Sequence, residues 1–315
     1  MAFDLVTLGL ACADVMVRPV DEFPERGKLN LVPQLEVHLG GLAGVTAAVY
    51  CRLMGEEGSG AAFVGRVGAD GFGDYVHHAL ASNGVNVERV SRTPDAATAA
   101  TVVLVSSDGE RTFIHHTGAA ATLAEEDIDF DFVARAKWLH WGGPAVTPGL
   151  DGEPIGRVFD RARQLGLGTS IDTCYDGHGI WYARIEHALP HTDVVMSSLE
   201  EAREYTGQRE PEDIADWYRA RGAEVALVKL GDQGLYVKDA DQAHHVPAHR
   251  VTAVDTTGAG DATCAGFLYG YLCGWDLLRT ARLANAVGGL TVQAMGGAEG
   301  VESLEKTIEF MESGI

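Results

Sequence analysis

Short apolar runs alternate with helix-length amphipathic segments along most of this 315-residue chain, and no other feature restricts its fold as strongly. Runs with the length of a β-strand occur at Leu5–Leu10, Ala61–Val64, Trp138–Trp141, Gly168–Ile171, Val194–Met196, Val225–Val228 and Leu235–Val237. Segments with a helical pattern lie between them, at Gly44–Met54, Asp74–Asn83, Pro154–Leu165, Leu199–Thr206 and Glu212–Arg221. This rhythm is typical of parallel strands joined by helical crossovers. It predicts one α/β domain over residues 1–315, with helices on both faces of a mostly parallel central sheet.

Two stretches interrupt the alternation. Residues 15–38 contain three prolines and no clear helix, and residues 97–117 read as two strands, Thr101–Val105 and Thr112–His116. Asp108-Gly109 between these strands is a hairpin signal. We expect the two stretches to form a small β-sheet beside the main one, where it could act as a lid that excludes water from a site. A hairpin that touches no site is the alternative.

Charge and composition exclude several classes of partner. The net charge is −21, from 24 basic and 45 acidic residues, and such a surface repels nucleic acids and anionic membranes. No apolar stretch is long enough to cross a membrane, and the N-terminus lacks the basic region of a signal peptide. The five cysteines form no CxxC pair, which favours free thiols in a reducing compartment. We therefore expect a cytoplasmic protein that binds neither nucleic acid nor membrane.

A glycine-rich turn near the C-terminus carries the strongest chemical signal. Residues 255–261 read DTTGAGD, between a strand-like stretch at Val246–Val254 and a helix-like run at Ala262–Cys273. Backbone N–H groups and the helix dipole at such a turn attract an anion. Asp261 would stand beside this anion site, with its pKa lowered by the helix end. The pair suits phosphoryl transfer to a hydroxyl group, although a glycine turn that only caps a helix is the plain alternative.

The heptapeptide resembles the carboxyl-terminal signature of the ribokinase family, also called the PfkB-type carbohydrate kinases. The Gly-Gly turn at 40–41, the pattern GRVGADGFGD at 65–74, and the segments 225–236 and 284–289 are also similar to that family. The resemblance spans about residues 14–297. It implies a ribokinase-like α/β/α fold with a β-sheet lid formed by about 15–38 and 97–117, and a homodimer through the lid is compatible with it. It also implies ATP-dependent phosphorylation of a hydroxymethyl group on a sugar, sugar acid or related polyol.

The resemblance assigns roles residue by residue. It makes Asp261 the catalytic base, and the amides of the next residues form the anion hole: Gly258, Ala259 and Gly260. It places four residues at the phosphate acceptor: Asp14, Gly40, Gly41 and Val45. It places five at the nucleotide: Ser198, Lys229, Gly231, Gly234 and Asn285. The implied cofactors are ATP and Mg²⁺, with Glu201 acting on Mg²⁺ through water, and K⁺ is a further expectation at Asp255.

Several of these residues also have ordinary structural explanations. Ser198 and Glu201 fit a capping box, and Lys229 and Asn285 fit surface positions. Asp14 fits a solvated turn, and glycines fit turns that need positive φ.

Two departures from the family pattern concern the substrate. Val45 stands where many sugar kinases have Asn, and residues 172–176 read DTCYD where they have D-x-N-x-R, so that Cys174 replaces the Asn. The loss of two polar groups and one basic group argues against ordinary ribose or fructose. A nucleoside kinase of the same family is one alternative, with Trp141 or Phe113 stacking on a base. A non-catalytic protein that senses a sugar or nucleotide is another, but the intact GAGD argues against it.

Overall fold

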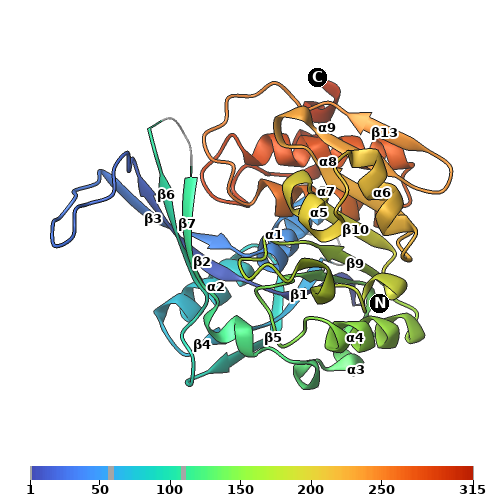
Figure 1. Ribbon diagram of the computed structural model, residues 1–315, viewed down its shortest axis with the longest axis horizontal. Helices are drawn as coiled ribbons and strands as arrows, with labels where there is room; N and C mark the ends of the chain where they lie inside the picture. Colours follow the sequence, from blue (N-terminus) through green and yellow to red (C-terminus); the bar gives the residue numbers. More distant parts are fainter. Residues whose placement is uncertain (1, 56–59, 108–110, 315) are drawn as a thin grey trace.

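The computed structural model describes residues 2–55, 60–107 and 111–314, and within them a nine-stranded sheet lies between two layers of helices (Figure 1). The strand order is β13-β12-β11-β10-β9-β8-β1-β4-β5. The strands are β1 (Phe3–Gly9), β4 (Ala61–Gly68), β5 (Asn86–Thr93), β8 (Ala136–Gly142), β9 (Gly168–Asp172), β10 (Val194–Ser198), β11 (Val225–Lys229), β12 (Leu235–Lys238) and β13 (Ala243–Val246). Neighbours from β5 to β11 are parallel, whereas β12 and β13 are antiparallel.

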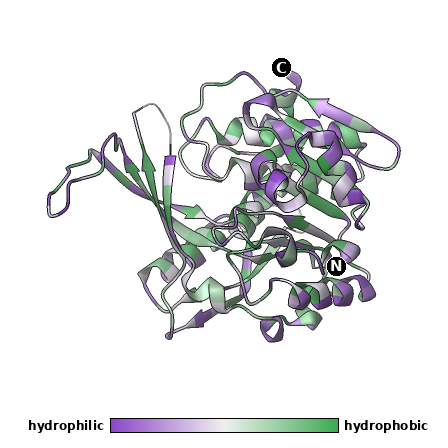
Figure 2. Ribbon diagram, viewed as in Figure 1, coloured by the Kyte–Doolittle hydropathy of each residue, from purple (hydrophilic) through white to green (hydrophobic). Residues whose placement is uncertain are grey.

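Alternating side chains on the strands enter two separate apolar cores. Leu5 of β1 packs in the core beneath one helical layer, and its neighbour Val6 packs in the core beneath the other. The first layer contains α1 (Leu42–Met54), α2 (Gly71–Ser82), α7 (Ala259–Leu272), α8 (Leu277–Thr291) and α9 (Leu304–Glu312). The second contains α3 (Phe130–Val133), α4 (Glu153–Gln164), α5 (Leu199–Thr206) and α6 (Pro211–Arg219). Figure 2 shows hydrophobic central strands and a hydrophilic outer surface on helices such as α4. The three-layer prediction is therefore confirmed.

A smaller sheet projects from the body of the molecule (Figure 1). Its order is β3-β2-β6-β7, from β2 (Cys12–Arg18), β3 (Gln34–Gly40), β6 (Ala100–Val105) and β7 (Arg111–His116). The strands expected at 101–105 and 112–116 are present, and the expected Asp108-Gly109 turn lies outside the described residues. The interrupting stretches thus leave the main sheet together and pair with one another.

The strand expected at Val246–Val254 is wrong. The strand β13 ends at Val246, and the chain from 247 to 254 has no regular hydrogen-bonded structure. Pro247 has no N–H to continue the ladder, which ends the strand there. Most of this irregular segment lines a large cavity, which explains why apolar residues occur in it.

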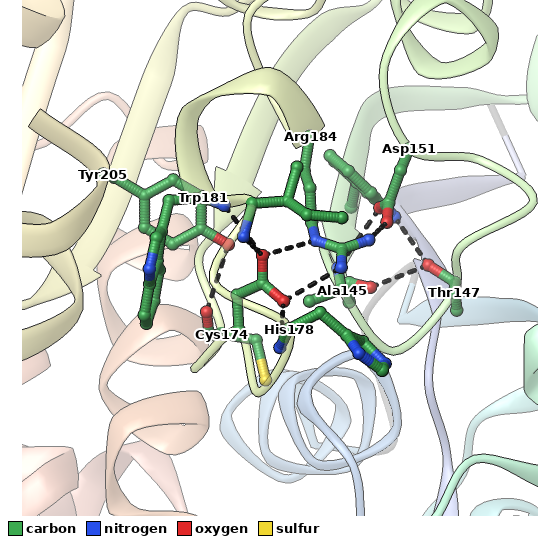
Figure 3. Close-up of polar contacts among 12 residues, drawn as sticks. Ala145, Thr147, Asp151, Cys174, His178, Trp181, Arg184 and Tyr205 are labelled. Atoms are coloured by element: carbon green, nitrogen blue, oxygen red, sulfur yellow. Dashed lines mark hydrogen bonds and ion pairs between the residues drawn. The ribbon is translucent and has the colours of Figure 1, made fainter.

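A buried charge cluster fixes the loop that follows β9 (Figure 3). The Asp176 carboxylate accepts two hydrogen bonds from Arg184, at 2.7 and 2.9 Å, and three from the backbone N–H groups of residues 178, 180 and 181. Arg184 also pairs with Asp151. Burial alone would raise the pKa of Asp176, but Arg184 and the backbone donors outweigh it and hold the pKa well below the usual value. Asp176, which differs from the Arg of the D-x-N-x-R pattern, is therefore a structural carboxylate.

None of the helices within the described ranges combines the length and apolar composition that crossing a membrane requires.

We expect Arg184→Gln to destabilise the fold by about 3–5 kcal/mol, because the buried Asp176 carboxylate loses its charged partner. Urea unfolding measures this loss. The control is Arg157→Gln, since Arg157 pairs with Glu125 and Glu153 on the surface and should leave the midpoint nearly unchanged. Equal midpoints for the two variants would contradict the role of the cluster.

Candidate active site

A cavity of about 1320 Å³ opens at the carboxyl ends of β9, β10 and β11, beneath the start of α7. Its wall brings together most of the predicted catalytic, nucleotide and metal residues: Asp261, Ala259, Gly260, Ser198, Lys229, Gly231, Gly234, Asn285 and Glu201. Arg111 reaches the wall from β7 of the small sheet. The wall does not include Gly258, Asp255, or the four predicted acceptor residues Asp14, Gly40, Gly41 and Val45.

The helix α7 begins three residues earlier than the sequence indicated, so that Gly258 is its N-cap. Gly258 has φ 71°, and a Cβ there would lie 2.5 Å from Gly297 Cα, so this position requires glycine. In the described chain, the N–H groups of Gly258, Gly260 and Asp261 meet no protein acceptor, whereas that of Ala259 donates to the Thr256 carbonyl at 3.3 Å. The first turn of α7 thus offers free donors beside the cavity.

Asp261 lies in this first turn, but its pKa moves opposite to the prediction. Burial first, and then the charge of Asp172, raise the pKa of Asp261 to about 8, and Lys229 offsets only part of this. The expectation of a low pKa is therefore wrong, because removal from water outweighs the helix dipole. The backbone carbonyl of Asp261 accepts a hydrogen bond from Thr46 at 3.1 Å, which joins α7 to α1.

Lys229 is not a surface residue. Its Nζ lies 2.6 Å from Oδ1 of Asp172, which has no exposed surface, and 3.6 Å from Sγ of Cys264. A Cβ built on Gly260 would lie 3.2 Å from this Nζ, so the ammonium rests against the first turn of α7. Sequence reasoning did not assign Asp172 to the site, although its place at the end of β9 is a signal that could have found it.

Ser198 and Glu201 form the capping box that begins α5, and both also face the cavity. The Ser198 side chain accepts from the Glu201 N–H, and Glu201 Oε2 accepts from the Ser198 N–H, both at 3.3 Å. The same Oε2 accepts from the Thr173 hydroxyl at 2.9 Å. Burial raises the pKa of Glu201, and Lys229 opposes the shift. The capping box is therefore confirmed, and it is compatible with the predicted roles because both residues also line the cavity.

The remaining predicted nucleotide residues, Gly231, Gly234 and Asn285, shape another part of the cavity wall. Gly234 has φ 91°, and a Cβ there would lie 1.9 Å from the Val246 carbonyl oxygen, so only glycine fits the turn against β13. Gly231 also has positive φ, 61°. Asn285 is buried rather than on the helix surface, and its Nδ2 donates to the Pro247 carbonyl at 2.9 Å. That bond ties α8 to the irregular segment of the wall.

The predicted acceptor residues gather at the base of the small sheet. Asp14 lies on β2, is only 6% exposed, and accepts from the Cys12 thiol at 3.2 Å. Burial raises its pKa to about 6. A Cβ on Gly40 would lie 2.1 Å from Asp14 Oδ2, and one on Gly41 would lie 2.7 Å from Ala11 Cα. Both glycines are thus explained by close packing.

Two of the predicted site residues, Val45 and Asp255, are buried and have structural contacts. Val45 is completely buried in α1 and packs against Gly297, so it presents no surface to a substrate. Asp255 is also buried, and its two oxygens accept from the N–H groups of Thr257 and Gly296, at 2.9 and 3.0 Å. It therefore joins the turn before α7 to the loop after α8. Trp141 has no exposed surface either, which rules it out as a stacking platform for a base.

A model of the pfkB family of carbohydrate kinases matches residues 2–304. The 2-dehydro-3-deoxygluconokinase of Bacillus subtilis is 29% identical over 285 residues, which cover 87% of each chain. The nucleoside kinase of Methanothermobacter thermautotrophicus is 29% identical over 297 residues, 93% of this chain and 90% of that one.

Solved structures resemble the whole chain. A ribokinase of Arabidopsis thaliana, complexed with ribose and ATP, aligns with a TM-score of 0.84 at 25% identity and 99% coverage of both chains. A provisionally named ribokinase II from E. coli, in complex with ATP and Mg²⁺, aligns with a TM-score of 0.86 at 23% identity, over 99% of this chain and 100% of that one. The predicted ribokinase-like fold is confirmed. The chain therefore belongs to the pfkB family of carbohydrate kinases.

Proposed function

We propose that this kinase transfers the γ-phosphoryl group of ATP to a hydroxymethyl group of a sugar, sugar acid or related polyol. The observation that carries the proposal is the first turn of α7. It presents free N–H donors and the Asp261 carboxyl group to one large cavity. Asp261 accepts the proton of the attacking hydroxyl, and the free N–H groups of Gly258, Gly260 and Asp261 stabilise the charge on the moving phosphoryl group. A pKa above the ordinary range makes Asp261 a stronger base than a typical surface aspartate.

The nucleotide is proposed to occupy the part of the cavity between α8, the Gly231–Gly234 turn and the segment at 247–253. Lys229 and the start of α7 then face its phosphates. The nucleotide is anionic and the chain is acidic, so the positive potential has to be local. An E. coli structural neighbour that binds ATP and Mg²⁺ supports this choice of nucleotide and ion.

The carboxylates on the wall fit a divalent cation. The charges of Asp172 and Glu201 both raise the pKa of Asp261, and that of Asp172 raises the pKa of Glu201, so a cation would relieve repulsion that Lys229 compensates only in part. Mg²⁺ takes few protein ligands and keeps several waters, which suits Glu201 acting through water. When bound, Mg²⁺ supplies neutralisation of the phosphate charge. A K⁺ ion beside Asp255 stays a prediction.

The acceptor is proposed to lie between Asp14 and Asp261, with the small sheet as its lid. Asp14 provides a carboxylate for hydroxyl donors, and its charge also raises the pKa of Asp261, which places the two carboxylates in one electrostatic environment. Arg111 supports the lid role, because it brings β7 to the cavity wall. Val45 has no exposed surface, so its difference from the family pattern acts only through packing.

A nucleoside acceptor is the second candidate, because one relative is named a nucleoside kinase. Of the two aromatic residues considered for stacking, only Phe113 is exposed, at 52%. Phosphoryl transfer to a panel of sugars, sugar acids and nucleosides distinguishes the two acceptors. A non-catalytic sensing protein would transfer to none of them.

A homodimer through the small sheet is a further proposal. Leu35 of β3 and Ile114 of β7 are 62% and 57% exposed. Strand pairing puts both on the face opposite Asp14, with the partly exposed Val17 and Leu104 between them. Such an apolar face on a projecting sheet suits a second copy of itself, since a closed two-fold dimer buries the same patch on both partners.

We expect Asp261→Asn to lower kcat about 10²–10⁴-fold with little change in the affinity for ATP, because the variant keeps the shape of the side chain and loses the base. Steady-state kinetics with the best acceptor measure this. Asp213→Asn, at an exposed position in the first turn of α6, is the control. Turnover near that of the wild type would remove Asp261 from its proposed role.

The same Asp261→Asn change should stabilise the fold, increasingly as the pH rises from about 4 to about 8. The folded-state pKa of Asp261 is raised from 3.8 to about 8, so ionisation above pH 3.8 favours the unfolded chain until the folded group also ionises. Thermal unfolding of both proteins across this range measures the difference. A gain in Tm that does not vary with pH would contradict the buried carboxylate.

Replacing both Leu35 and Ile114 with Glu should convert a dimer into monomers, because like charges would face each other in the apolar interface. Sedimentation over a concentration series should show association weakened at least about tenfold. Leu165→Glu, at an exposed site after α4, serves as the control. A wild-type protein that is monomeric at all concentrations would refute the proposed dimer.

A further inference from the structure

The buried pair between Lys229 and Asp172 has a geometry that packing alone does not explain. Asp172 ends β9 and Lys229 ends β11, and β10 lies between these strands. The register places Asp172 beside Met196 and Lys229 beside Ser198. The lysine side chain therefore crosses the end of β10 to meet the carboxylate at 2.6 Å. It crosses on the side of α7, as its contact with Cys264 shows.

We propose that Asp172 is a positioning residue that holds the Lys229 ammonium against the first turn of α7, where the ammonium contacts the terminal phosphoryl group of the nucleotide. This inference rests on the proposed phosphoryl transfer and deepens it. It assigns a role to Asp172, which lies outside the set of residues predicted from the sequence.

The ammonium lies where the helix dipole opposes it, and Asp172 is the anion that offsets this cost. The N-terminus of a helix carries partial positive charge, so a cation beside it is repelled. The Nζ lies near Gly260 nonetheless, and its side chain is 13% exposed on the cavity wall. The free N–H donors of α7 and the ammonium consequently point to one shared anion. A terminal phosphate is the anion that this kinase would bring there.

The carboxylate of Asp172 is only half satisfied within the described chain. Its Oδ1 accepts from Lys229, but Oδ2 is buried and has no hydrogen-bond partner. A buried, half-satisfied carboxylate is costly, and a group retained at such cost calls for a functional explanation. Because Asp172 and Cys264 take two of the three N–H donors of the ammonium, one donor remains available for a phosphate oxygen.

Among the charged groups around Lys229 in the described chain, Asp172 is the one that forms an ion pair with it. Glu201 on α5 and Asp261 on α7 also act on the ammonium, but neither makes an ion pair with it among the described residues. Cys264 of α7 contacts the Nζ as a thiol, since burial raises the thiol pKa well above its ordinary value. Removing the carboxylate of Asp172 would therefore release the lysine side chain toward Glu201 and Asp261.

A set of variants tests the inference: Asp172→Asn, Lys229→Met, and the double variant with both changes. We expect Asp172→Asn to lower kcat about 10–100-fold, with little change in the KM of the acceptor, because a charged donor to the transferring group is misplaced. Lys229→Met should lower kcat at least as much. The double variant should be no slower than Lys229→Met, because Asp172 acts only through Lys229. It also removes both buried charges, so it should fold even if a single variant does not.

Nucleotide affinity provides a readout that is independent of turnover. With Mg²⁺ present, Asp172→Asn and Lys229→Met should each weaken binding of the non-hydrolysable ATP analogue AMP-PNP while leaving ADP binding nearly unchanged, since only the former has a terminal phosphate at α7. The control pair is Lys238→Met and Asp216→Asn, which removes a 2.8 Å ion pair between β12 and α6. The control variants should match the wild type in both measurements.

The outcomes distinguish failure of the proposed phosphoryl transfer from failure of the role of Asp172. If the wild type binds neither nucleotide, the proposed function fails and this inference fails with it. If the wild type prefers AMP-PNP but Asp172→Asn retains that preference and the wild-type kcat, Asp172 is purely structural and the inference alone is overturned. A double variant slower than Lys229→Met by the full Asp172→Asn factor would also overturn it, because Asp172 would then act independently.

Discussion

Several like charges share one poorly hydrated space at the carboxyl ends of β9, β10 and β11. Asp172, Glu201 and Asp261 are all held there, and Lys229 is the cation placed among them. Burying carboxylates together is unfavourable, as the raised pKa values of Glu201 and Asp261 indicate. The free energy for this arrangement comes from the two apolar cores on either side of the sheet. The packing of apolar side chains around the site therefore offsets the cost of burying these like charges.

Local patterns predicted the architecture well, because a buried strand and an amphipathic helix each leave a signal within a few residues. They failed at 246–254, where apolar residues face a cavity rather than a neighbouring strand, and where Pro247 ends the ladder. The cluster of Asp176, Arg184 and Asp151 had no local signal at all. Its members meet only after the loop behind β9 folds back on itself, so only the tertiary structure reveals that Asp176 is structural.

At the candidate site, the sequence indicated many of the residues that line the cavity but not their electrostatics. The dipole of α7 is a local property and suggested a low pKa for Asp261, whereas burial and the charge of Asp172 are tertiary properties and raise it. The position of Lys229 illustrates the same limit. Asp172 lies 57 residues earlier in the chain, so no spacing rule connects the two, although both end parallel strands at one edge of the sheet. Val45 shows the converse, because a residue within a matching motif has no exposed surface.

Side chains of the small sheet alternate between the face proposed for association and the face proposed to meet the acceptor. Ile114 faces outward on β7, while its neighbours Phe113 and His115 face the side that carries Asp14. A partner that covers the outer face would therefore fix the same strands whose inner face carries Asp14. Because β2 connects this sheet directly to β1 of the main sheet, its orientation also sets the position of Asp14 relative to Asp261. The proposed dimer contact, on the outer face, would thus order Asp14, the carboxylate proposed to hold the acceptor, without touching either substrate.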